Sequence, residues 1–246
     1  MKHNASDITA ERFVDELMGH RSKSEHRKIR RYFKADDPEN RVIGVRMKLV
    51  FDLAKEFTDM PLSEIEKLLE SPYYEARMGA VSIMDFRAQR KKITEPERRE
   101  LFFLYLRRHD RINNWDFMDR AAPRVIGGFL YECRQPRDIL YKLARSANPW
   151  ERRTAIVSTA YFLRKKEAED TFRLAELLIG DGHEYVLKAV GTWLRQAGQV
   201  DPQQLSAFLE KHAAGMPRTT LSTAMEKLSK EQKAYFRGKK PHPQKY

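Results

Sequence analysis

The chain has 246 residues, of which 33% are charged, 41% are hydrophobic and 11% are aromatic, a mixture that excludes an intrinsically disordered protein and allows a sizeable core. Lysine and arginine outnumber aspartate and glutamate by 47 to 35, so the formal net charge is +12 and a polyanion such as nucleic acid is the expected partner. The single cysteine, Cys133, excludes an intrachain disulfide and a thiolate metal cluster, and no apolar run approaches the ~20 residues of a membrane span.

Helical periodicity dominates the sequence throughout. Apolar residues recur at helical spacing in 60–72, 96–110, 137–146, 170–181 and 202–213. In the first of these segments, Ser63 and Glu66 follow the capping-box pattern S-x-x-E. The prolines fall mostly near the ends of the expected helices, and alternating segments bounded by Asn-Gly or Asp-Gly turns are absent. The sequence therefore predicts an all-α protein.

A repeat links three of these regions. The segment YEARMGAVS (74–82) is echoed by WERRTAIVS (150–158), which places Arg77 and Arg153 76 residues apart. Half of that interval, 38 residues beyond Arg77, leads to Trp115. A period near 40 built from helix pairs is typical of HEAT-like α-solenoids. We expect one HEAT-like domain over 1–236, with a helical lead-in over 1–24 and a basic, flexible tail over 237–246.

The second helix of each repeat is expected to face the concave side of the solenoid. These helices would lie at 72–91, 113–130, 149–165, 183–197 and 216–229, and their polar residues are strongly basic. The cations include Arg77, Arg87, Arg120, Arg124, Arg152, Arg153, Arg164, Lys188, Arg195 and Arg218. A concave basic groove suits duplex DNA, and binding there would weaken with salt as counterions are released. The alternative is an ordinary solvated helix face.

One acidic residue stands out in this basic surrounding. In RINNWDFMDR (111–120), Trp115 and Asp119 lie four residues apart and so share a helix face. A carboxylate beside DNA is useful where positive charge develops, as on the oxocarbenium-like sugar of a nucleotide that loses its base. An aromatic face also favours a cation. The alternative is that Trp115 fills the core and Asp119 pairs with a neighbouring arginine.

Several segments together closely resemble the bacterial DNA alkylation repair proteins of the AlkD type. They are RYFKADDPENRVIGVRMKLVFDLAKEF, LSEIEKLLESPYYEAR, NNWDFMDRAAPRVIG, NPWERRTAIVSTAYFLRK, LKAVGTWLRQAGQVD and HAAGMPRTTLSTAMEKLS, in this order along about residues 25–236. The N-W-D-x-x-D, W-x-R-R and MPRT elements are specific in combination, whereas each alone is a weak signal.

The resemblance implies a monofunctional DNA glycosylase that removes N3- and N7-alkylated purines, such as 3-methyladenine and 7-methylguanine, without flipping the base into a pocket. It implies that Asp119 is the catalytic aspartate, with Trp115 packing against the sugar. It also implies DNA-contacting roles for Arg153, for its neighbour Arg152 and for Arg195. Lys188, Trp193 and Arg120 are further candidate DNA-binding residues.

One position departs from the family pattern. Where the pattern places its second tryptophan, this chain has Thr192 in GTWLRQ, and Trp193 follows one residue later, roughly 100° around the helix. Either a local shift lets Trp193 serve, or the aromatic cradle has a single wall and excision is weakened.

Two functions compete with the glycosylase. One is a weakly active or inactive relative that binds DNA structures through the same groove, which Thr192 favours. The other is a helical-repeat scaffold for an acidic protein, which explains the charge but not the motifs. The sequence shows no metal-ligand spacing among its seven histidines and no Walker, GxGxxG or GxSxG motif. We therefore expect no metal, no cofactor and no membrane association, but a monomer that binds double-stranded DNA in the cytoplasm, associated with the nucleoid.

Overall fold

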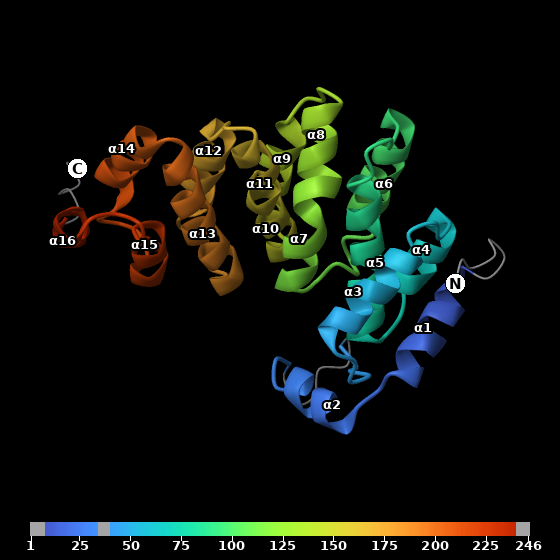
Figure 1. The fold of residues 1–246 in the computed structure, drawn as a ribbon. Helices are drawn as coiled ribbons and strands as arrows, with labels where there is room; N and C mark the ends of the chain where they lie inside the picture. Colours follow the sequence, from blue (N-terminus) through green and yellow to red (C-terminus); the bar gives the residue numbers. More distant parts are fainter. Residues whose placement is uncertain (1–7, 34–39, 240–246) are drawn as a thin grey trace. The chain divides into compact units, whose positions relative to one another are not determined.

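The structure is a computed structural model that describes residues 8–33 and 40–239 (Figure 1). Within these ranges every regular element is helical, and the one β feature is an isolated parallel bridge between Arg41 and Tyr73. The prediction of an all-α protein is confirmed. None of the described helices is both long enough and apolar enough to cross a bilayer. The chain forms two compact units, which divide between Phe129 and Leu130.

The first unit is built around α5 (Tyr74–Ala88). This helix packs against α3 (Met47–Glu56), α4 (Leu62–Leu69) and α7 (Trp115–Ala122), and almost all of its residues are buried. The remaining elements are α1 (Ala10–Gly19), α2 (Lys23–Arg30), α6 (Glu95–Arg107), the π-helical turn η2 (Pro123–Gly127) and α8 (Gly128–Glu132), which runs across the division. Because α5 is buried on nearly all sides, including its charged residues Glu75, Arg77 and Asp85, it fixes where its neighbours lie.

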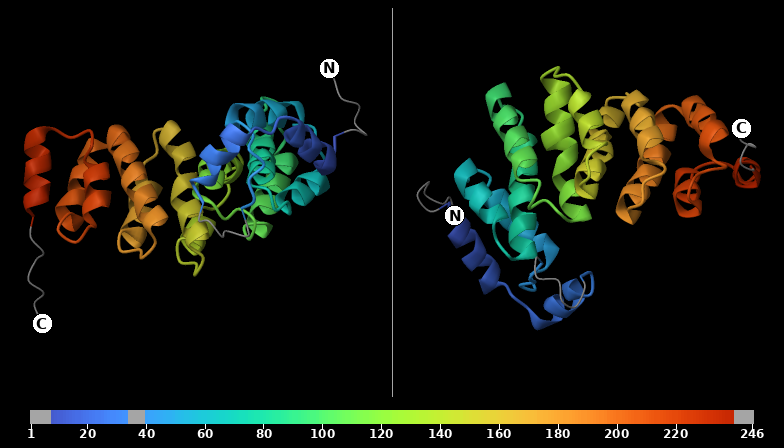
Figure 2. Two further views of the ribbon diagram at one scale, coloured as in Figure 1. Left: turned by 90° about the horizontal axis from the view of Figure 1, so that it is seen from below. Right: turned by 180° about the vertical axis from the view of Figure 1, so that it is seen from behind.

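The second unit is centred on α13 (Glu184–Val200). This helix packs against α10 (Pro149–Ser158), α12 (Glu169–Leu178), α14 (Pro202–His212) and α15 (Arg218–Ala224). Figures 1 and 2 show α12 and α13 side by side as one antiparallel pair. The unit also contains α9 (Asp138–Leu143), α11 (Ala160–Arg164) and α16 (Lys230–Gly238). The predicted tail begins inside α16, and its residues 240–246 lie outside the described part of the chain.

The predicted first and second helices of each repeat match the observed elements within a few residues. Helices α4, α6, α9, α12 and α14 are the first members of the pairs, and α5, α7, α10, α13 and α15 begin the second members. Proline marks the start of two of these helices. Pro149 and Pro202 are the first residues of α10 and α14, where the missing N–H costs nothing.

The capping-box prediction at Ser63 is wrong. Helix α4 begins at Leu62 with Pro61 at its N-cap position, so Ser63 already lies inside the helix. Within the described residues, complete capping boxes occur instead at Thr94 with Glu97 and at Ser229 with Gln232. The S-x-x-E pattern marks a helix start only when its serine precedes the first helical residue.

The two arginines of the sequence echo have the same structural position. Arg77 on α5 is fully buried and donates to Asn113 Oδ1 at 2.9 Å and to the carbonyl oxygen of Arg111, both in the loop before α7. Arg153 on α10 is 5% exposed and donates to the carbonyl oxygen of Tyr185 near the start of α13. In both units, therefore, the repeated arginine ties one second helix to the beginning of the next.

A buried glutamate organises the loop that precedes α3. The Glu75 carboxylate accepts hydrogen bonds from the backbone N–H groups of Ile43 at 3.0 Å, Gly44 at 2.8 Å and Val45 at 3.2 Å. Gly44 has φ of +97°, a left-handed backbone conformation that other residues rarely adopt. This arrangement fixes where Arg46 and Met47 begin α3, beside the start of α7.

Candidate functional site

Trp115 and Asp119 lie at the start of α7 and one turn further on, as the sequence predicts. The Asn114 side chain caps the helix by accepting a hydrogen bond from the Trp115 backbone N–H at 2.9 Å. The Trp115 side chain is 37% exposed, and Asp119 is exposed. The alternative of a core tryptophan is therefore wrong, because Trp115 lies partly exposed at the surface.

The helix that carries Asp119 changes geometry directly after the site. Pro123 begins the π-helical turn η2 between α7 and α8. Proline has no N–H to donate to the carbonyl four residues earlier, which here belongs to Asp119. Single π-helical turns within α-helices often occur at functional sites, and this one lies next to the candidate catalytic residue.

Arg120 belongs to a buried ion-pair cluster. Its guanidinium lies 3.1 Å from Asp85, and Arg124 lies 2.9 Å from the other oxygen of the same carboxylate. Asp85 is fully buried, and Arg120 also lies over the ring of Phe86, 4.4 Å from its centroid. Burial raises the pKa of the Asp85 carboxyl, although the two arginines act to lower it. This cluster joins α5 to α7, whereas a DNA contact by Arg120 remains a prediction.

A second carboxylate, Asp116, lies between the two residues of the predicted pair. Its Oδ2 accepts a short hydrogen bond from the Tyr74 hydroxyl, and its Oδ1 is buried with no hydrogen-bond partner. Burial raises the pKa of Asp116 to about 6, with a smaller contribution from the negative charge of Asp119. Burial, followed by the charge of Asp116, also raises the pKa of Tyr74. The prediction assigned no role to Asp116, although the N-W-D-x-x-D motif contains it.

We expect the stability conferred by Asp116 to depend on pH. The folded protein raises the pKa of this carboxyl from 3.8 to about 6, so the folded state binds the proton more tightly than the unfolded state does. The stability that Asp116 confers is thus fully present below pH 4 and is lost as the pH rises through 6. Asp116→Asn, which can still accept from Tyr74, should become more stable relative to wild type by up to about 3 kcal/mol between pH 4 and pH 7.

Urea unfolding of both proteins at several pH values measures this difference. Exposed Asp59, paired with Arg90, provides the control, since the difference between Asp59→Asn and wild type should not grow in the same direction. A constant difference between Asp116→Asn and wild type across this range would contradict the raised pKa.

In the second unit, the W-x-R-R arginines have extensive intramolecular contacts. Arg152 forms a bidentate ion pair with Asp181, at 2.6 and 2.9 Å, and donates to the carbonyl oxygens of Ser146 and Ala147. Arg153 is buried against the start of α13. Both side chains therefore hold loops of the unit in place, and their predicted contacts with DNA remain predictions.

Helix α13 carries the remaining predicted residues. Lys188 is exposed, pairs with Glu184 at 2.8 Å and lies 4.7 Å from the centroid of the Tyr185 ring. Arg195 pairs with Glu226 of the second unit. Thr192 and Trp193 are both half-buried.

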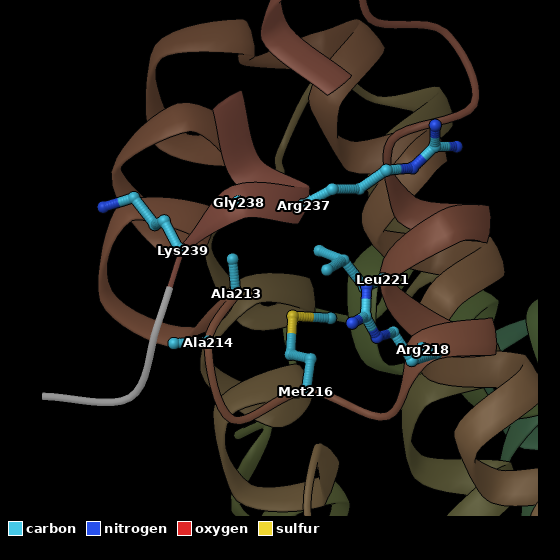
Figure 3. Close-up of a pocket in the computed structure, with 8 residues that line it drawn as sticks. All are labelled: Ala213, Ala214, Met216, Arg218, Leu221, Arg237, Gly238 and Lys239. Carbon is cyan, nitrogen blue, oxygen red and sulfur yellow. The ribbon is translucent and has the colours of Figure 1, made fainter. Parts of the chain in front are cut away.

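The arginine of the MPRT element lines a cavity of about 370 Å³ between α15 and α16. Figure 3 shows the Arg218 guanidinium close to Met216 and Leu221, while Lys239 points away from them. Lys239 instead pairs with Glu210. In the part of the chain that the structure describes, no group of three or more His, Cys, Asp or Glu side chains is placed to hold a metal ion.

Comparisons with known proteins identify the family. A family model described as DNA alkylation repair enzyme matches residues 13–228. A solved structure of a predicted DNA alkylation repair enzyme from Enterococcus faecalis is similar with a TM-score of 0.69 and 16% identity, covering 86% of this chain and 98% of its own. A comparison with curated protein sequences finds no match.

Two structures from Streptococcus mutans are also similar. AlkD2 has a TM-score of 0.53 and 18% identity over 89% of this chain and 98% of its own, and Smu.31 from strain UA159 has 0.54 and 19% over 90% and 100%. At these identities the likeness establishes the fold alone, and it confirms the predicted all-α helical-repeat class. Since the family model spans most of the sequence, this chain belongs to the DNA alkylation repair enzyme family.

Proposed function

We propose that this protein is a DNA glycosylase that hydrolyses the N-glycosidic bond of N3- and N7-alkylated purines in duplex DNA. The observation that carries the proposal is the accessible pair of Trp115 and Asp119 on one face of α7. An exposed carboxylate one turn from an exposed aromatic face provides two groups that favour a cation. The family to which the chain belongs indicates that the substrate is DNA.

The proposed hydrolysis of the N-glycosidic bond requires neither a cofactor nor a general acid. The C1′–N bond breaks with its electron pair moving to the cationic purine, which leaves as a neutral base. The sugar becomes oxocarbenium-like, and the Asp119 carboxylate stabilises this charge while Trp115 packs against the sugar. Water adds to C1′ and loses its proton to Asp119 or to solvent. Since the alkylated base is already a good leaving group, bond cleavage does not require capture of the base in an enclosed pocket.

The basic composition supports DNA as the ligand. The formal net charge of +12 implies that several phosphates would be neutralised on binding, with a log–log salt slope of about −0.9 for each. Exposed Lys188 is a candidate for one such contact. We propose that Arg120, Arg152, Arg153 and Arg195 act near the phosphates chiefly by holding the helices that face DNA.

The second candidate function is a relative that binds DNA but excises weakly or not at all. One observation favours it, namely that α13 carries Thr192 where the family pattern has a tryptophan. The experiment that separates the two is timed release of 7-methylguanine and 3-methyladenine from methylated duplex DNA. Release by the wild-type protein supports the glycosylase, and binding without release supports the second candidate.

We expect Thr192→Trp to increase the rate of release. The family resemblance implies that the tryptophan expected at this position packs against the sugar, and such an aromatic face would contribute about 0.5–2 kcal/mol, which corresponds to roughly twofold to thirtyfold in rate. Half-buried Gln196 lies one turn further along α13, so Gln196→Trp is the matched control and should leave the rate unchanged. An equal effect of the two tryptophans, or none from Thr192→Trp, would show that Thr192 does not complete an aromatic cradle.

A further inference from the structure

The cavity of about 370 Å³ in the second unit lies where α14 ends, α15 begins and α16 ends (Figure 3). The MPRT element of the sequence supplies two of its lining residues, Met216 and Arg218. All of its lining residues belong to the second unit, so it contains neither Trp115 nor Asp119. The proposed glycosylase chemistry gives this cavity no role, but three of its features together define a ligand class.

The first feature is an apolar floor without aromatic rings. Ala213, Met216 and Leu221 line the cavity and are buried. None of the described residues that line it is aromatic, so a nucleobase would find no ring on which to stack. Methionine adapts its flexible side chain to the shape of an apolar group. The floor therefore suits an aliphatic side chain better than a base.

The second feature is an arginine whose charge is available beside this floor. The Arg218 guanidinium lies close to Met216 and Leu221 (Figure 3), and it forms no ion pair or hydrogen bond with the described residues. Lys239, in contrast, is paired with Glu210. A guanidinium is weakly hydrated and can donate two parallel hydrogen bonds to one carboxylate. The cavity thus favours an anion that carries an apolar group.

The third feature is a pair of backbone acceptors in the turn after α14. The carbonyl oxygens of Ala213 and Ala214, both residues of the cavity wall, accept no hydrogen bond from the described residues. Carbonyl groups at a helix end can be satisfied by side chains, water or a ligand. A peptide has N–H groups to donate to them, whereas the phosphodiester backbone of DNA only accepts hydrogen bonds. This feature favours a peptide over DNA.

From these features we propose that the cavity binds the C-terminus of an acidic partner protein that ends in an aliphatic residue. The terminal carboxylate pairs with Arg218, and the last side chain lies against Met216 and Leu221. Arg237 lines the cavity from α16 but extends away from Met216 (Figure 3), so it meets acidic residues that precede the terminus. Capture of a terminal carboxylate is a recurring mode of peptide recognition, and the net charge of +12 favours an acidic partner.

The test is binding of a fluorescein-labelled octapeptide, made of six acidic residues followed by isoleucine and leucine, to the full chain at physiological salt. Fluorescence anisotropy compares the free C-terminal carboxylate with its amide, so that attraction of the acidic residues to other cations is common to both. The wild-type protein should bind the carboxylate form about tenfold more tightly, as expected for one charge-assisted hydrogen bond. Serine in place of the final leucine should weaken binding by roughly tenfold, because the floor is left unfilled.

Variants of the protein assign the preference to the cavity. Arg218→Ala should remove the preference for the carboxylate over the amide, and Arg218→Lys should keep only part of it, because lysine lacks the planar fork. Arg173→Ala is the matched control, since Arg173 is an exposed arginine of the same unit that pairs with Glu169, and it should keep the full preference. Thermal unfolding checks that each variant is folded.

Equal affinity of the wild-type protein for the carboxylate and amide peptides would overturn the proposal, as would full retention of the preference in Arg218→Ala. Undamaged duplex DNA tests the other occupant. If Arg218→Ala weakens binding of DNA more than binding of the carboxylate peptide, the cavity serves a phosphate and the peptide assignment is wrong. The inference is independent of the proposed glycosylase, since Asp119→Asn should bind the peptide with wild-type affinity.

Discussion

Asp119→Asn should lower the rate of 7-methylguanine release from methylated duplex DNA by about 10²–10³-fold, while affinity for the same DNA is unchanged or slightly increased. In the proposed reaction, the carboxylate stabilises positive charge that develops on the sugar only in the transition state, so its loss should affect the chemical step rather than binding. In the ground state, the same carboxylate repels the phosphates of DNA. The measurement is single-turnover release under saturating protein, with binding followed separately by anisotropy.

Asp59→Asn is the matched control, because Asp59 is an exposed carboxylate of the same unit that pairs with Arg90 at the surface. It should release base at the wild-type rate. If Asp119→Asn also releases base at that rate, the catalytic assignment is wrong. If the wild-type protein releases no base at all, the enzyme proposal fails and the DNA-binding relative is the better description.

The second large effect concerns stability. Asp85→Ala should lower the free energy of unfolding by about 3 kcal/mol, because it leaves Arg120 and Arg124 partly buried without their shared counter-ion. For a chain of this size, this corresponds to a decrease in Tm of roughly 6–12 °C. The value lies at the low end for buried pairs because the side chains of Arg120 and Arg124 are 21% and 30% exposed and retain some hydration.

Asp52→Ala provides the comparison for the stability effect. Asp52 pairs with Lys48 on the exposed surface of α3, so its removal should cost less than about 1 kcal/mol. Thermal unfolding of the three proteins at pH 7 gives both values. A loss below about 1 kcal/mol for Asp85→Ala would mean that burial of the carboxylate offsets the attraction of the two arginines.

The same cluster shows what the sequence alone does not reveal about its arginines, namely which carboxylates they meet in the folded chain. The local sequence around an arginine on a predicted groove-facing helix does not show whether its guanidinium meets solvent or a buried carboxylate. Arg120 follows Asp119 directly, but its partner Asp85 lies 35 residues earlier on α5. Arg152 likewise meets Asp181, 29 residues later. Such pairings depend on which helices pack together, and helical periodicity carries no information about them.

The sequence by itself determined the paired helices from α4 onward, their period near 40 residues, and the shared face of Trp115 and Asp119. These features are local, since helix periodicity places residues i and i+4 together whatever surrounds them. The family resemblance was also contained in short contiguous motifs, and the family model over residues 13–228 confirmed it.

Only the tertiary structure decided which polar groups are buried and what they meet. It placed Tyr74 against Asp116, raised the pKa of that carboxyl, and surrounded Trp115 with residues from α2, α3 and α5. The physical reason is that desolvation and long-range contacts depend on packing between segments 30 to 90 residues apart in sequence, from Lys28 to Asp116. The residues that surround Trp115 were visible in the sequence, but their proximity was not.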